Sequence, residues 1–240
     1  MLKKEDYQQH ISATFNTELE TLRSHMLAMG GKVEQQLTTA LDALMTMDSG
    51  AAETIVRQDN EVNRMEMEID DECATILARR QPTASDLRLV IAIIKINRDL
   101  ERVGDEAAKV AKQAVRLSED GISQSRFIEI RHIGTRVTVM LRQALDAFAR
   151  LDVNKAIEVV RDDFEVDTEY DTGMRSLITF MVEDPRKIGA ILNEMWALRS
   201  LERIGDHACN IAEHVVYLVN GMDIRHGGLK DLEDKIQGGE

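Results

Sequence analysis

The sequence has few of the residues that interrupt helices or mark sheets. Its 240 residues include two prolines, two cysteines and 4% aromatic residues. Proline ends or kinks a helix, and strands are usually enriched in aromatic and β-branched residues. Because Ala, Leu, Glu, Arg and Met are abundant instead, the composition predicts an all-α protein.

The two cysteines, Cys73 and Cys209, lie within apolar patterns of helical spacing. Free cysteine is among the most buried residue types, so we expect two buried thiols rather than a disulfide or a thiolate metal site. The sequence also lacks any run of 18 or more apolar residues, and its first 15 residues lack the apolar core of a signal peptide. We therefore expect a cytoplasmic protein that meets a membrane only through partner proteins.

Positive charge is scarce: 30 Lys and Arg residues stand against 43 Asp and Glu residues, for a net charge of −13. Nucleic-acid binding requires clustered Lys and Arg to neutralise phosphates, and the sequence has no such cluster. Nucleic acid is therefore not expected as a partner. The acidic excess is compatible with cation binding and equally with an ordinary solvated surface.

The chain contains an internal repeat. Residues 40–63 align without gaps on residues 144–167, with 11 of 24 positions identical, and "LERVGD" at 100–105 returns as "LERIGD" at 201–206. In the first half, apolar residues recur at helical spacing over 15–47, 51–77 and 87–117. Long helices joined by short turns pack antiparallel. We therefore predict two tandem three-helix bundles, residues 8–120 and 124–220, followed by a flexible tail, 221–240.

Acidic residues four positions apart interrupt apolar lines on two helices of each half. The third helices carry Glu101 with Asp105 and Glu202 with Asp206, and the middle helices carry equivalent pairs. Antiparallel packing would bring the pairs of one half face to face. The predicted sets are Asp59, Asn63, Glu101 and Asp105 in the first half, and Asp163, Asp167, Glu202 and Asp206 in the second.

Carboxylates clustered in a low dielectric cannot all stay ionised without cations. Oxygen ligands suit Mg, Mn or Ca, and Zn or multinuclear Fe are further candidates. Gly104 and Gly205, inside the hexapeptides, would let a neighbouring helix or a metal centre approach closely. A single acidic pair of this spacing is most often solvated, so a scaffold without metal remains an alternative.

Little in the sequence supports catalysis. Residues 129–132 form a lone Glu-x-x-His, whereas ferritin-like di-iron proteins use two such motifs. Phosphate-binding glycine loops, nucleophile elbows and C-x-x-C motifs are all missing. We therefore do not predict an enzyme; a carboxylate-bridged di-metal enzyme built on the bundle is the alternative.

The tandem repeat, the D-x-x-V-(N/D) motif of each middle helix and "LER(V/I)GD" of each third helix together resemble the PhoU family. The similarity includes "RQPTASDLRLV" at 80–90 and extends along essentially the whole chain, closest to the proteobacterial members. Asn63 departs from the family pattern, because its amide can ligate a cation but contributes no charge.

The resemblance implies two three-helix bundles side by side, with metal ions or clusters held by the acidic motifs. It also implies a non-enzymatic role in bacterial phosphate signalling. The implied partners are the phosphate-specific ABC transporter, through its ATPase subunit, and a sensor histidine kinase. A protein of this kind represses the phosphate-starvation response when phosphate is plentiful, and it is often a homodimer.

Overall fold

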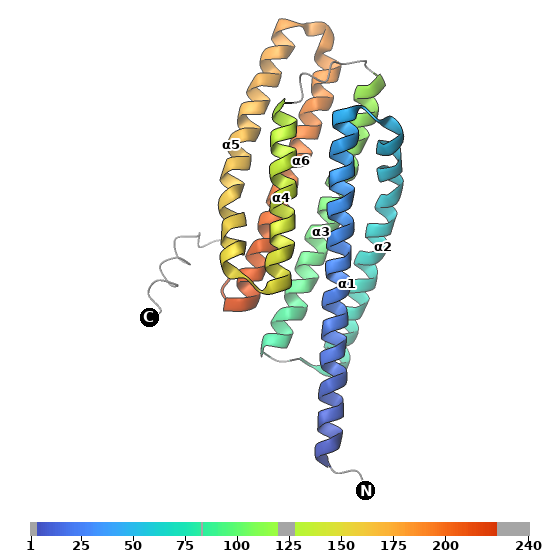
Figure 1. Ribbon diagram of the computed structural model, residues 1–240, viewed down its shortest axis with the longest axis vertical. Coiled ribbons are helices and arrows are strands. Elements are labelled where there is room, and N and C mark those ends of the chain that lie inside the picture. The colour runs from blue at the N-terminus through green and yellow to red at the C-terminus, as the bar shows by residue number, and fades with distance from the viewer. Residues whose placement is uncertain (1–3, 83, 120–127, 225–240) are drawn as a thin grey trace, which may run out of the picture.

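The computed structural model describes residues 4–82, 84–119 and 128–224, and this part of the chain is built from helices (Figure 1). Six long helices follow one another up and down the molecule, with one short 3-10 turn before the last. Their bounds are α1 Lys4–Thr46, α2 Ser49–Arg80, α3 Ala84–Glu119, α4 Ile128–Arg150, α5 Val153–Glu183, η2 Pro185–Lys187 and α6 Ile188–Asn220.

The turns between the first and second helices of each half are built in the same way. Met47 and Leu151 adopt left-handed backbone conformations at the ends of α1 and α4. Asp48 and Asp152 then cap the next helices, since their carboxylates accept hydrogen bonds from the backbone N–H three residues on. The equivalent turns give both halves one topology, as the repeat predicts.

The two bundles lie side by side and share one apolar core (Figure 1). Their most extensive contact is between α3 and α6, and α1 also packs on α4. A Cβ added at Gly30 would lie 2.6 Å from Leu145, and one added at Gly134 would lie 2.5 Å from Leu41. Each glycine and leucine occupies the position of its counterpart in the other repeat, so the bundles are related by an approximate two-fold axis.

The all-α prediction and the prediction of tandem bundles are confirmed. Cys73 and Cys209 are buried free thiols, as expected, and burial raises the pKa of Cys73 to about 12. None of the helices in the described ranges is long and apolar enough to cross a membrane. The tail predicted to be flexible lies outside the described residues from position 225 onward.

Candidate functional site

The first predicted set lies between α2 and α3. Asp59 and Asn63 come from α2, and Glu101 and Asp105 come from α3. Burial raises the pKa of Asp59, and the neighbouring Asp105 carboxylate raises it further. The pKa of Glu101 is raised by burial and then by Asp105, with smaller effects of Glu66 and Asp59. The two helices therefore bring these carboxylates within electrostatic reach of one another, and we call this set, with Glu66, the first carboxylate group.

The second predicted set, here called the second carboxylate group, lies between α5 and α6. Burial, with the Asp206 and Asp167 carboxylates, raises the pKa of Asp163 to about 6. Burial and Asp206 likewise raise the pKa of Glu202 to about 7, against the attraction of Arg199. Asp167 and Asp206 are exposed, and the pKa of Asp206 is raised by partial loss of solvent around it and by the neighbouring Asp167 carboxylate. Carboxylates that titrate this close to neutrality are held together at a real electrostatic cost.

Several oxygens of the two groups lack hydrogen-bond partners. In the part of the chain that the structure describes, these buried atoms are Asn63 Oδ1, Asp163 Oδ1 and Glu202 Oε2. Buried polar atoms in folded proteins almost always have a partner, so each such oxygen is available to a cation or a water molecule. These atoms belong to residues that the sequence predicts as ligands.

The donors suit a hard cation in type and in charge, because every predicted ligand atom is a carboxylate or amide oxygen. As the side chains stand, no three His, Cys, Asp or Glu residues in the described ranges are arranged to hold a metal ion. Binding would therefore require side chains of α2 and α3, or of α5 and α6, to turn toward a common point. The backbone already provides the two facing helices.

The motif glycines allow close helix packing beside each group. A Cβ added at Gly104 would lie 3.3 Å from Val62 Cγ1 and 3.8 Å from Asp59 Oδ1. At Gly205 it would lie 3.2 Å from Val166 Cγ1 and 3.7 Å from Asp163 Oδ1. Spacings this tight leave little room for a side chain, so the expected close approach of the neighbouring helix is confirmed.

Two residues that the prediction did not include, Glu66 and Gln36, act on the predicted ligands of the first group. Burial and Asp70 raise the pKa of Glu66, which also acts on Glu101. Glu66 thus supplies the fourth charge that Asn63 lacks, and its position seven residues after Asp59 could have indicated it. Gln36 of α1 is 3% exposed, and its Nε2 donates to Asp59 Oδ1 at 3.4 Å. Only the tertiary packing of α1 identifies Gln36.

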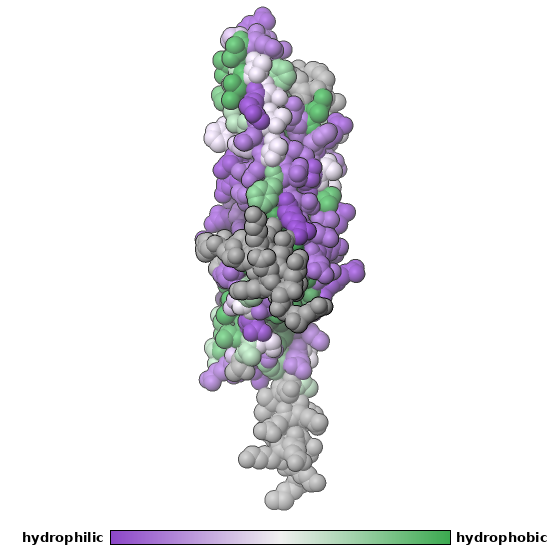
Figure 2. Space-filling view, turned by 90° about the vertical axis from the view of Figure 1, so that its left-hand side faces the viewer, coloured by the Kyte–Doolittle hydropathy of each residue, from purple (hydrophilic) through white to green (hydrophobic). Residues whose placement is uncertain are grey.

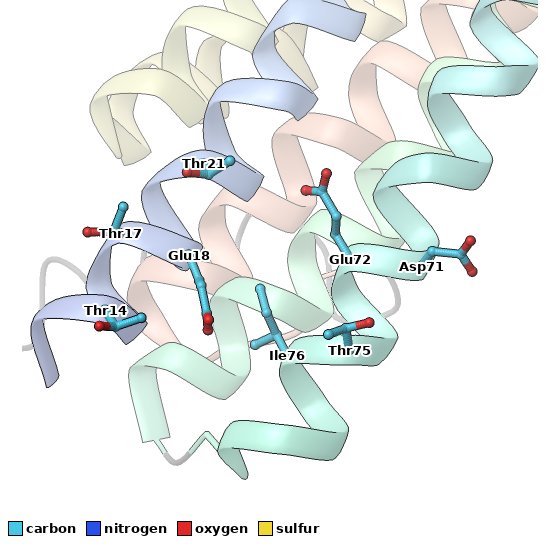
Figure 3. Close-up of a pocket in the computed structure, with 8 residues that line it drawn as sticks. All are labelled: Thr14, Thr17, Glu18, Thr21, Asp71, Glu72, Thr75 and Ile76. Atoms are coloured by element: carbon cyan, nitrogen blue, oxygen red, sulfur yellow. The ribbon is translucent and has the colours of Figure 1, made fainter. Parts of the chain in front are cut away.

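Other features lie outside both groups. His132 of the lone Glu-x-x-His is exposed on α4 and does not contribute to either set. A pocket of about 530 Å³ opens between α1 and α2, where Glu18 and Ile76 point into the space between the helices (Figure 3). Its lining residues include none of the predicted ligands.

Comparisons with known proteins agree with this architecture. The PhoU domain family matches the chain twice, at residues 26–114 and 130–215. The chain is 54% identical over 237 residues to the phosphate-specific transport system accessory protein PhoU homolog of Pseudomonas aeruginosa, covering 99% of this chain and 98% of that protein. It is 44% identical to the phosphate-specific transport system accessory protein PhoU of Escherichia coli, covering 95% of each.

A solved structure shows the same fold. The crystal structure of PhoU from Pseudomonas aeruginosa superposes with a TM-score of 0.85 at 57% identity, covering 87% of this chain and all of that one. The family match includes both bundles and both LER(V/I)GD hexapeptides. With its two PhoU domains, its six-helix fold and identity along nearly its whole length, the chain belongs to the PhoU family.

Proposed function

We propose that the chain is a cytoplasmic, non-enzymatic regulator of phosphate uptake and phosphate signalling. In this role it links a phosphate ABC transporter, through the ATPase subunit, to a sensor histidine kinase, and represses the phosphate-starvation response when phosphate is plentiful. The observation that carries the proposal is the 54% identity over nearly the full length of a relative named as an accessory protein of phosphate-specific transport. Accessory proteins act through contacts, which suits a chain without a nucleophile and base motif.

We further propose that the two carboxylate groups hold divalent cations or multinuclear metal, with Mg, Mn, Ca, Zn and Fe as candidates. The ligands would come from the first and second carboxylate groups defined above. A bound cation would neutralise acids whose burial raises their pKa, so its role would be to fix α2 against α3 and α5 against α6. The unpaired buried oxygens of Asp163 and Glu202 support this proposal.

The regulatory proposal is tested in the organism that carries the gene. Removing the gene should switch on the phosphate-starvation genes in phosphate-rich medium, because the repressing link between transporter and kinase is lost. A reporter of one such gene measures the effect, and the wild-type chain supplied in trans should restore repression. Reporter expression that stays low without the gene would contradict the regulatory role. A variant with Asp163→Ala and Glu202→Ala, checked for normal abundance, shows whether repression requires the second carboxylate group.

We also propose that the chain forms a homodimer through the free end of the α5–α6 pair, which forms the upper end of the molecule (Figure 1). Figure 2 shows hydrophobic residues gathered near this end. Five apolar side chains of α5 and α6 are 41–77% exposed: Ile178, Val182, Ile188, Leu192 and Trp196. We call these five residues the α5–α6 patch. In the first repeat the positions equivalent to Ile178, Val182 and Trp196 carry Ala74, Ala78 and Lys95.

The neutral charge of the surrounding segment and the exposed apolar area of the patch both favour a second copy of the chain as its binding partner. Residues 171–203 contain five acidic and five basic residues, so this segment is neutral in a chain of net charge −13. Two copies repel least where they meet at a neutral surface. The five side chains, each 41–77% exposed, together expose on the order of a few hundred Å² of apolar surface. A typical interface of about 800 Å² per partner contains a comparable apolar area.

Sedimentation velocity at 1–100 µM protein tests the dimer. The wild-type chain should sediment as a dimer, and the variant Ile178→Ala, Val182→Ala, Trp196→Lys, which installs first-repeat residues, should sediment as a monomer. The matched control is Met67→Lys, which changes an apolar side chain of the first repeat that is 61% exposed. A monomeric wild type contradicts the dimer itself, whereas a variant that still dimerises contradicts the choice of surface.

A further inference from the structure

A groove between α2 and α3 is lined mainly by basic side chains. Its volume is about 400 Å³, and it lies where the early turns of α2 pass the last turns of α3 (Figure 1). We call it the α2–α3 groove, and its lining residues, three from each helix, are Glu53, Val56, Arg57, Lys112, Val115 and Arg116. Three cations and one acid make the groove positive, in a chain whose net charge is −13.

The three cations of the groove are exposed and have no acid of their own. Arg57 Nη2 donates to Thr54 Oγ1 at 3.1 Å, and Arg116 Nη1 donates to Gln113 Oε1 at 3.4 Å. Both guanidinium groups therefore contact neutral side chains. Among the residues that the structure describes, no carboxylate forms an ion pair with Arg57, Lys112 or Arg116. Their charge is available to an anion from outside the chain.

The second repeat does not preserve this charge. At the equivalent positions, Ile157, Arg161, Glu213 and Tyr217 replace Glu53, Arg57, Lys112 and Arg116. One cation and one acid cancel there. Because both repeats form the same three-helix bundle, the bundle itself does not require three cations at this place. The positive groove is a property of the first repeat alone.

The two arginines are the principal ligands that the groove offers. Burial raises the pKa of Asp59, and Lys112 opposes the increase, so Lys112 acts partly on the first carboxylate group. Arg57 and Arg116 approach the groove from different helices. Guanidinium groups bind phosphate through two parallel hydrogen bonds, whereas lysine contributes a point charge.

The size of the groove favours a ligand larger than one phosphate ion. Its volume is within the range of small-molecule sites, and a single phosphate fills only a small part of it. Val56 and Val115 are half-buried and pack against the core, so they give the groove an apolar floor. A chain of phosphate groups can contact both arginines at once.

We infer that the α2–α3 groove binds a small anion with two or more linked phosphate groups. Arg57 and Arg116 hold phosphate oxygens from the two helices, and Lys112 adds attraction. The anion is either an inorganic polyphosphate or a nucleoside di- or triphosphate, since both contain the same phosphate chain. This inference goes beyond the proposed regulatory function, and it depends on neither carboxylate group.

Calorimetric titration of the chelator-treated full chain with tripolyphosphate, ATP and orthophosphate tests the inference. Tripolyphosphate should bind at least tenfold more tightly than orthophosphate, because a single phosphate reaches fewer of the cations. Equal affinities for ATP and tripolyphosphate would assign recognition to the phosphate chain, and tighter binding of ATP would add a contact of the nucleoside with the apolar floor. Both results support the inference.

Substitution of the two arginines should remove most of this affinity. Arg57→Gln with Arg116→Gln should weaken tripolyphosphate binding at least tenfold, because two charge-assisted contacts are lost. The matched control is Arg161→Gln with Arg175→Gln, two exposed arginines of α5. It changes the net charge by the same amount and should alter the affinity by less than about twofold.

Two further variants test the sign of the effect, while circular dichroism verifies that each variant is folded. Lys112→Glu installs the second-repeat residue and should weaken binding at least tenfold. Glu53→Gln removes the acid of the groove and should tighten binding roughly two- to fivefold, a gain that misfolding does not produce. Tripolyphosphate and ATP that both fail to bind at about 1 mM, orthophosphate that binds as tightly as tripolyphosphate, or an equal loss in the α5 control would each overturn the inference.

Discussion

Replacing Glu202 by glutamine and Asp163 by asparagine should stabilise the metal-free protein at pH 8 by about 2 kcal/mol. Burial raises the pKa of these acids to about 7 and about 6. A pKa shift of one unit corresponds to about 1.4 kcal/mol of stability. The expected gain is well below the total that the two pKa shifts would give at this rate, for two reasons. Solvent reaches Asp163, which is only partly buried, and the substitution weakens the contact between Arg199 and Glu202.

The sign of this effect gives the wild-type protein an unusual pH dependence. An acid whose folded pKa lies above its unfolded value binds more protons when folded, so stability falls as pH rises through that interval. For Glu202 and Asp163 the interval runs from about pH 4 to about pH 7. Metal-free wild type should therefore unfold at higher urea concentration at pH 5 than at pH 8, and the double variant should lose most of this difference.

Adding Mn²⁺ shows whether repulsion among the carboxylates of the second group, rather than a change in packing, explains the difference in stability. Added at pH 8, it should raise the urea midpoint of the wild type and leave that of the double variant nearly unchanged. The matched substitutions Asp59→Asn and Glu101→Gln should give a smaller gain at pH 8, because Gln36 already donates a hydrogen bond to the Asp59 carboxylate. A double variant that is less stable than wild type at both pH values would contradict the account.

Helical features were predictable from the sequence because they depend on short-range spacing. Apolar residues that recur every 3.6 positions indicated the three helices of each half. The constant offset between residues 40–63 and 144–167 indicated the internal repeat. The acidic pairs could be placed on facing helices because residues four apart share one face of a helix. Spacing along the chain therefore predicts contacts between two antiparallel helices that follow one another in the sequence.

Contacts across three or more helices were not predictable in this way. Gln36 acts on Asp59 only because α1 packs over the junction of α2 and α3, and no spacing along the chain encodes that distance. The contact of Arg203 could not be predicted either, because it joins the two bundles: Arg203 and Arg102 look equivalent in "LERIGD" and "LERVGD", yet Arg203 of α6 contacts Glu106 of α3, whereas Arg102 contacts acids of its own helix. An internal repeat copies positions, whereas single substitutions at the shared interface decide their electrostatics.

Asp99 is the residue of the α3–α6 interface whose removal should cost most. Its Oδ1 lies 2.9 Å from His207 Nδ1 and accepts from Asn210 Nδ2 at 3.3 Å, and its Oδ2 lies 3.4 Å from His214 Nε2. Asp99→Ala should lower the free energy of unfolding at pH 7 by about 3 kcal/mol, because it leaves buried polar groups of α6 without their acceptor. Urea denaturation followed by circular dichroism measures the loss.

The matched control is Ser200→Ala, at the equivalent position of the second repeat, which should cost less than about 1 kcal/mol.

The pH dependence supplies a second test. Burial opposes ionisation of Asp99, but hydrogen bonds from His207 and His214 outweigh it and lower the pKa of the carboxyl group. An acid with a lowered pKa stabilises the fold above its unfolded value near pH 4, and this contribution disappears as pH falls through the lowered folded value. The difference between wild type and Asp99→Ala should therefore narrow as pH falls below about 4. A loss that matches Ser200→Ala, or one that does not change in acid, would show that packing rather than the Asp99 carboxylate joins the two bundles here.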